Sequence, residues 1–173
     1  DKNIIDILVL IDDGPIETKD LFLFRRNVFA SVDKIALNID KNIRPQPLLV
    51  AELKENCYDG KYEILNLISY GTSLYDPKDM LAAIKLAEIH KEIVLKKFER
   101  YIVSYVAAGS LFRGEKSHDI DVYIIVDDTD VKKMSRFDLR ERLRSMIISQ
   151  GYDASDIAGV KKLFHIQVYI LTD

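Results

Sequence analysis

The chain alternates between short continuous apolar runs and longer stretches in which apolar residues recur at helical spacing. A short apolar run bounded by turn residues is typical of a buried strand. Such runs stand at 7–11, 48–50, 101–108, 119–126 and 163–171. Two prolines precede 48–50, which indicates that this strand lies at an edge or begins there.

The stretches between these runs predict helices. The helical spacing covers 19–38, 52–70 as one or two segments, and 78–99 as two segments that meet near His90. Ser135 followed by Asp138 has the form of a capping box, so a further helix begins there, and we expect Gly151 to end it. The alternation of strands and helices predicts an α/β protein, α+β in the stricter sense, with a mixed β-sheet flanked by helices.

The first strand of the chain resembles a later one. Residues 4–13 align without gaps on 119–128. The second aspartate of the later pair keeps a counterpart in Asp6, whereas the first is replaced by Ile4. The alternative interpretation is that two unrelated buried strands share an apolar composition.

A second pair of segments extends this repeat. Residues 44–49 resemble 165–170, and in both copies a predicted helix lies between the paired strands. We therefore predict two tandem modules, over 1–88 and 89–173, the first cut at its front and the second at its back.

Composition limits the classes of function. With 173 residues, of which 48% are hydrophobic, the chain can bury one substantial core or two small ones. The net charge of −3 argues against a general nucleic-acid binder. No apolar run has the length of a membrane span and no signal peptide is evident, so we expect a cytoplasmic protein without a membrane partner. Cys57 is interpreted as an ordinary thiol, and we expect that residues preceded Asp1.

Candidate chemistry follows the predicted strand at 101–108. Gly109-Ser110 ends this strand, and Asp119 and Asp121 stand two apart on the next one. Residues two apart on a strand share a face, so the two carboxylates point together. Such carboxylates repel each other unless a cation lies between them, and Mg²⁺ or Mn²⁺ accepts carboxylate oxygens. Glycine lets backbone amides approach a triphosphate, and a serine hydroxyl donates to a phosphate oxygen.

The motif can be compared with a known family. Gly109-Ser110-Leu111-Phe112-Arg113-Gly114, followed by Asp119-Ile120-Asp121, resembles the signature of minimal nucleotidyltransferases of the DNA polymerase beta superfamily. The run 117–130 and Gln167-Val168-Tyr169 are similar to predicted archaeal members with tandem modules. The resemblance covers nearly the whole chain, but only the Gly-Ser and Asp-x-Asp elements are specific.

The resemblance implies a nucleotidyltransferase fold and a role for each motif residue. Gly109 and Ser110 would hold the phosphates of the incoming nucleotide, and Arg113 would assist them. Asp119 and Asp121 would bind Mg²⁺ or Mn²⁺ and be the catalytic residues. The activity implied is transfer of a nucleoside monophosphate from an NTP to a hydroxyl of a protein, an RNA or a small molecule.

The sequence departs from the family pattern at several positions. The usual third carboxylate falls at or near Gln167, and glutamine binds a cation weakly and cannot act as a general base. In the first copy, Ile4 and Gln46 replace acids, so we expect that copy to be catalytically dead. The loop after Gly109-Ser110 is shorter than the commonest family spacing, which would bring Lys116 and His118 toward the site.

Other hypotheses remain open beside the enzyme. The fold could serve as a catalytically inactive nucleotide-binding or protein-scaffolding module, and a protein partner or a homo-oligomer is compatible with either function. An RNA-binding module would need a basic surface. A P-loop over 109–117 is disfavoured, because Glu115 breaks the Gly-Lys adjacency and a strand follows where a helix is needed.

The remaining polar residues are interpreted as structural. His118 and His165 could be metal ligands or bases, but single histidines are more often ordinary polar contacts. Tyr169 is expected to pack in the core, with base stacking as the alternative. The arginines of the predicted helix after Ser135 are interpreted as a solvated face: Arg136, Arg140, Arg142 and Arg144.

Overall fold

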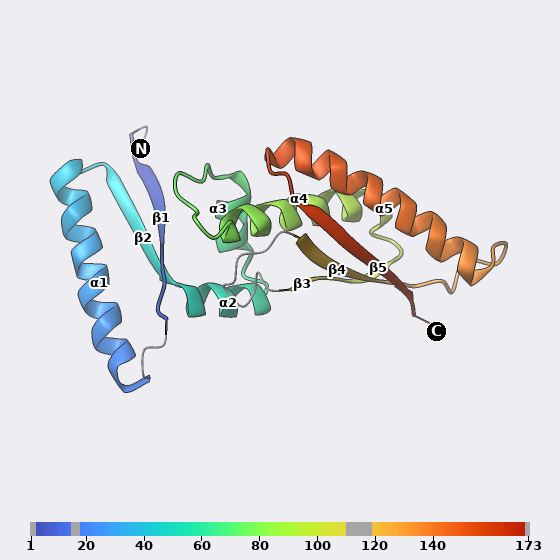
Figure 1. Cartoon of the computed structure of the whole chain (residues 1–173), viewed down its shortest axis with the longest axis horizontal. Coiled ribbons are helices and arrows are strands. Elements are labelled where there is room, and N and C mark those ends of the chain that lie inside the picture. Colours follow the sequence, from blue (N-terminus) through green and yellow to red (C-terminus); the bar gives the residue numbers. More distant parts are fainter. Residues whose placement is uncertain (1–2, 15–17, 110–118, 172–173) are drawn as a thin grey trace. The chain divides into compact units, whose positions relative to one another are not determined.

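The computed structural model of the chain describes residues 3–14, 18–109 and 119–171. Its helices and strands follow in the order β1 (Ile5–Ile11), α1 (Thr18–Ile39), β2 (Ile43–Leu49), α2 (Val50–Tyr58), α3 (Tyr62–Tyr70), α4 (Met80–Phe98), β3 (Ile102–Ala108), β4 (Asp119–Val126), α5 (Arg136–Ala158) and β5 (Leu163–Ile170) (Figure 1). The fold is therefore mixed α/β with two small sheets, as the alternation predicted.

The chain divides into two compact units. Unit 1 comprises Asp1–Lys61 and unit 2 comprises Tyr62–Asp173. The boundary expected between residues 88 and 89 falls inside α4, which is a single helix. The expected break of this helix near His90 is wrong, because the His90 side chain makes its hydrogen bonds to neighbouring elements and leaves the backbone of α4 helical.

Unit 1 is a strand-helix-strand unit followed by α2. β1 and β2 pair in parallel, with Asp6 opposite Arg44 and Leu8 opposite Gln46. β2 is longer than predicted and contains both prolines of this region, while Val50 already begins α2. Prolines at alternate positions remove N–H groups along one side of a strand, which suits β2 to an edge of the sheet.

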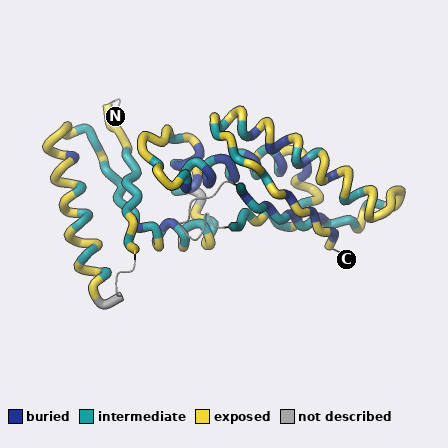
Figure 2. Tube along the Cα trace, viewed as in Figure 1, coloured by how far each residue is buried: buried dark blue, intermediate teal, exposed yellow. Residues whose placement is uncertain are grey.

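Unit 1 buries little apolar surface. In its described part, the buried hydrophobic side chains are those of Ala36, Leu49 and Leu53. α1 keeps several large apolar side chains exposed, among them Phe22 and Leu37. Figure 2 shows α1 as mostly exposed or half-buried. The sequence of α1 is amphipathic, but the other described parts of unit 1 bury only some of its apolar side chains.

Unit 2 contains a three-stranded mixed sheet in the order β3-β4-β5. β4 is its centre, antiparallel to β3 and parallel to β5. In β4 every second residue is buried: Ile120, Val122, Ile124 and Val126 are at most 1% exposed. The alternation places these residues on one face, over which α4 and α5 pack, and the residues between them on the opposite face (Figure 1).

A buried histidine joins four elements of this core. His90 is fully buried, with Nδ1 2.8 Å from the Tyr105 hydroxyl on β3 and Nε2 3.1 Å from the Ile147 carbonyl on α5. Its ring also lies 4.5 Å from the ring of Phe164 on β5. Because a carbonyl can only accept, Nε2 donates and Nδ1 accepts from Tyr105. Burial lowers the pKa of His90, which favours this neutral form.

α5 begins as predicted but ends later. The Ser135 hydroxyl accepts a hydrogen bond from the Asp138 amide, which confirms the N-cap. The expected end at Gly151 is wrong, because α5 continues to Gly159, whose positive φ of 66° forms the C-cap. A Cβ at residue 151 would lie 2.9 Å from the Phe164 ring. Glycine at this position therefore lets α5 approach β5 closely.

The two units share one local arrangement. In each, a helix connects two parallel strands, β1-α1-β2 in unit 1 and β4-α5-β5 in unit 2. The strand registers also agree with the sequence repeat, since Asp6 lies opposite Arg44 and Asp121 lies opposite His165. Residues that the repeat aligns thus occupy the same places in the two strand pairs.

Candidate functional site

The predicted carboxylates lie at the beginning of β4, on the face of the sheet that α4 and α5 leave uncovered. Asp119 and Asp121 stand on either side of the fully buried Ile120, so both point away from the core. Their side chains are 43% and 38% exposed. The two carboxylates therefore share one face of the sheet, as their spacing predicted, and both are partly exposed.

Gly109 lies beside one of these carboxylates. β3 ends at Ala108, directly opposite Asp121, and Gly109 follows with a φ of +116°. A Cβ built at residue 109 would lie 3.1 Å from Asp121 Oδ2. This backbone conformation and this close approach both require glycine. The structure thus brings together two of the predicted elements, the glycine at the end of β3 and the second aspartate of β4.

A histidine completes the group of polar side chains. His165 on β5 pairs with Asp121, and its Nδ1 lies 3.4 Å from Asp119 Oδ2 and 3.6 Å from Asp121 Oδ1. The sequence favoured an ordinary polar contact for His165 and did not indicate its place beside the two aspartates. The repeat contained a signal, because it aligned His165 with Arg44, which lies beside the aspartate of the first copy.

Gln167 lies two residues after His165 on β5, on the same face of the sheet. It pairs with Tyr123, and its Oε1 accepts a hydrogen bond of 2.7 Å from the Tyr169 hydroxyl. The rings of Tyr123 and Tyr169 stack with their centroids 6.4 Å apart. In the strand register, the residue opposite Asp121 is therefore His165, and Gln167 belongs to a neighbouring polar and aromatic strip on the same face. Tyr169 is 48% exposed on this strip and is not in the core.

Several predicted residues lie outside the described residues. These are Ser110, Arg113, Lys116 and His118. Their roles in the phosphate site stay predictions.

Unit 1 carries the counterpart of the carboxylate site. Asp6 Oδ1 accepts hydrogen bonds from Arg44 Nε at 2.5 Å and from Gln46 Nε2 at 3.3 Å. The hydrogen bond from Arg44 lowers the pKa of Asp6. Ile4 occupies the place of the other aspartate and is 43% exposed. Asp6, the one aspartate that the repeat keeps in unit 1, is thus already paired with a permanent positive charge.

The carboxylates of Asp119 and Asp121 suit a cation that also binds a phosphate. Within the described ranges, no group of three or more His, Cys, Asp or Glu side chains is placed to hold a metal ion. Mg²⁺ usually keeps several waters and takes one or two carboxylates together with substrate phosphates. Two half-exposed carboxylates on one face fit that mode of binding better than a closed cage of protein ligands.

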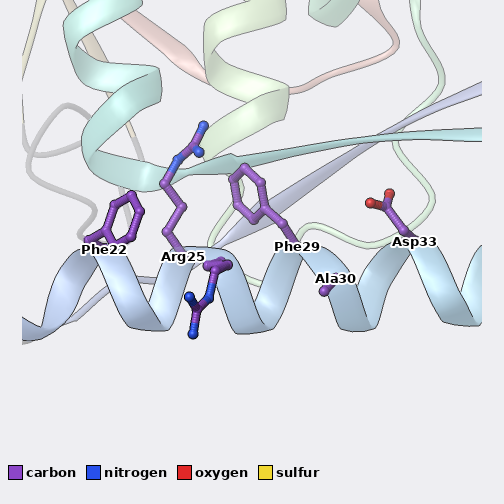
Figure 3. A pocket seen from close by; sticks show the side chains of 6 residues that line it. Phe22, Arg25, Phe29, Ala30 and Asp33 are labelled. Atoms are coloured by element: carbon purple, nitrogen blue, oxygen red, sulfur yellow. The ribbon is translucent and has the colours of Figure 1, made fainter.

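A hollow of about 420 Å³ lies elsewhere, along α1. It is lined by Phe22, Arg25, Arg26, Phe29, Ala30 and Asp33. Figure 3 shows Phe22, Arg25 and Phe29 projecting from one side of the helix. The Arg25 guanidinium lies over the Phe29 ring and binds Glu52 of α2. This hollow has no carboxylate pair, and since one helix supplies its whole lining, we do not assign the chemistry to it.

Comparisons of the chain with protein-family models, with curated proteins and with solved structures found no match. Over the part of the chain that the structure describes, no helix has the length and apolar character needed to cross a membrane.

Proposed function

We propose that unit 2 is a nucleotidyltransferase module that transfers a nucleoside monophosphate from an NTP to a hydroxyl acceptor, with Mg²⁺ or Mn²⁺ bound at Asp119 and Asp121. The observation that carries the proposal is the approach of Gly109 to Asp121, beside a second carboxylate on the same open face. Nucleotidyl transfer needs this combination, because phosphates must approach backbone amides while a cation neutralises their charge.

Each residue has a part in the proposed reaction. Asp119 and Asp121 hold the cation, which would neutralise charge on the phosphates when bound. Gly109 leaves room for the triphosphate, Ser110 donates to a phosphate oxygen, and Arg113 assists. The acceptor hydroxyl oxygen forms a bond to the α-phosphorus, the bond from that phosphorus to the bridging oxygen of the β-phosphate breaks, and pyrophosphate leaves. The hydroxyl proton passes to water.

The same proposal accounts for the repeat. The chain would consist of two tandem modules of one fold, of which the first has lost an acid at Ile4 and has its remaining aspartate paired with Arg44. We propose a cytoplasmic enzyme, with a protein, an RNA or a small molecule as acceptor. The equal strand registers of the two units support this interpretation.

Calorimetric titration tests the nucleotide site. Each NTP is titrated into the protein with and without Mg²⁺, and the titration is repeated on Asp119→Ala with Asp121→Ala. We expect binding that requires both the metal and the two aspartates. The matched control is Asp6→Ala, which removes the aligned aspartate of unit 1 and should leave NTP binding unchanged.

The outcomes separate the proposal from its main competitor. Binding that survives loss of both aspartates contradicts the proposed site. Mg²⁺-dependent NTP binding without any turnover on tested hydroxyl acceptors favours the second candidate, a catalytically inactive nucleotide-binding or scaffolding module. The hydrogen bond between Tyr169 and Gln167 favours this second candidate. Gln167 stands at or near the position where the family has its third carboxylate, and this hydrogen bond already occupies its side-chain oxygen.

A further inference from the structure

The two strands of unit 1 have outer edges of different character. β1 and β2 pair with each other, and no other strand of the described residues pairs with either. The Ile5 amide donates a hydrogen bond to the carbonyl of Asn42, just before β2. Successive residues of a strand turn their backbone groups to opposite edges, so the even-numbered residues of β2 face β1. The outer edge of β2 therefore includes Pro45 and Pro47, which have no N–H group to donate.

The outer edge of β1 keeps its hydrogen-bonding groups. By the same alternation it is formed by the backbone of Asp6, Leu8 and Leu10, and β1 contains no proline. Asp6 is the one charged residue of β1, and its carboxylate is paired with Arg44. Proline and lysine are among the residues that protect exposed strand edges from pairing. β1 has neither, so its outer edge offers donors and acceptors to a further strand.

Unit 2 shows what occupies the corresponding edge of β4. The repeat aligns the three edge residues of β1 with Asp121, Tyr123 and Ile125. In unit 2 these three residues pair with the antiparallel strand β3. Two strands alone form a sheet of marginal stability, and the described part of unit 1 buries few hydrophobic side chains. Unit 1 therefore has a place for an antiparallel strand and gains stability when one is added.

A second copy of the chain supplies a strand that fits this edge. When two β1 strands pair antiparallel around Leu8, the two Leu8 side chains lie opposite each other and Asp6 lies opposite a leucine. The neighbouring registers are less favourable. One puts Asp6 opposite the second copy's Asp12, where like charges repel, and the other puts Ile11 opposite Asn3. α1 packs mainly against β2, the strand farther from this edge (Figure 1).

We propose that the outer edge of β1 is a dimerisation site, at which the β1 strands of two copies pair antiparallel around Leu8 and join their sheets in the order β2-β1-β1-β2. Such an interface is closed by a two-fold axis, because both copies contribute the same edge. The inference goes beyond the proposed nucleotidyl transfer and uses no residue of the candidate site.

A charge-swap experiment tests the pairing around Leu8. Sedimentation velocity is measured on the full chain over a dilution series, for the wild type, Leu8→Lys, Leu8→Glu and an equal mixture of the two variants. We expect a dimer for the wild type. Each variant alone should dimerise at least about tenfold more weakly, because like charges then lie opposite each other. The mixture should recover the dimer, since the substituted side chains then carry opposite charges.

Two controls keep the experiment specific. Leu37→Lys changes an exposed leucine of α1 in the same unit and should leave dimerisation unchanged. Far-UV circular dichroism verifies folding of each variant. If the charged variants do not fold, Leu8→Cys in a Cys57→Ser background replaces them. Paired residues that exchange hydrogen bonds have Cα atoms about 5.5 Å apart, which a disulfide can span, so oxidation should give a covalent dimer. Leu37→Cys in the same background should give none.

Each outcome decides the inference. A wild type that stays monomeric at every concentration overturns it. A dimer that survives both Leu8 substitutions also overturns it, because the copies would then associate elsewhere. Loss in the single variants without recovery in the mixture overturns the register around Leu8. Loss in each variant and recovery in the mixture support the inference.

Discussion

Units 1 and 2 both place a helix between two parallel strands in the same register, yet they differ in how well that arrangement is buried. β4 has a neighbour on each side, and α4 and α5 pack on its sheet against β3 and β5, whereas among the described residues β1 pairs with β2 alone. The aligned residues Ile120 and Ile5 show the contrast directly, because the first is 0% exposed and the second is 52% exposed. A shared local plan therefore does not determine stability, which depends on how many layers pack against it.

The largest expected effect comes from removing apolar volume at aligned positions. Ile120→Ala should lower the free energy of unfolding by about 2–5 kcal/mol, because it leaves a cavity in a closed core. Ile5→Ala should cost less than about 1 kcal/mol, because water already reaches much of that side chain. Urea unfolding followed by circular dichroism measures both. Similar costs would show that the two strands are equally buried, which would remove the contrast between the units.

A smaller effect is expected from glycines with positive φ in the two units. Gly109→Ala should cost about 1–3 kcal/mol, because φ is +116° and the added Cβ would lie near Asp121 Oδ2. It should also weaken Mn²⁺ binding, since the carboxylate must move. The control is Gly14→Ala, where φ is +42° and no atom lies within 4 Å of the added Cβ, so a cost of roughly 1 kcal/mol and unchanged Mn²⁺ binding are expected. Unchanged Mn²⁺ binding in both variants would contradict the proximity of Gly109 to the site.

The smallest effect concerns pH and the core of unit 2. Burial lowers the pKa of His90 below its ordinary value of 6.5. As the pH falls, the unfolded chain therefore takes up a proton on this residue at a higher pH than the folded protein does. The stabilising contribution of neutral His90 is present above pH 6.5 and is lost as the pH falls from 6.5 through the lower pKa of the folded state. Thermal melts between pH 7.5 and 5 should show this loss. His90→Gln should be less stable throughout but should lack this part of the pH dependence, and an unchanged pH dependence in that variant would assign it to other groups.

Much of the fold could be predicted because its signals are local. The alternation at 119–126 predicted β4 and its two faces, and Ser135 predicted the start of α5. Gly151 was wrongly expected to end the helix, because the glycine is required by a tertiary contact. Phe164 on β5 fills the space that a side chain at residue 151 would need. Val50 was likewise assigned to a strand, although it begins a helix.

The candidate site likewise has one part that the sequence predicted and one part that it did not. Asp119 and Asp121 share a face because side chains alternate along a strand, so their two-residue spacing was enough to predict it. The place of His165 depends on the register between β4 and β5, which no local pattern specifies. The repeat offered the only sequence signal for it, through the alignment with Arg44.

The order of strands in unit 2 has a consequence for kinetics. β3 and β4 are consecutive in the chain, but β5 joins β4 only after the whole of α5 has been crossed. Such non-local pairing forms slowly, so His165 would reach the carboxylates late in folding.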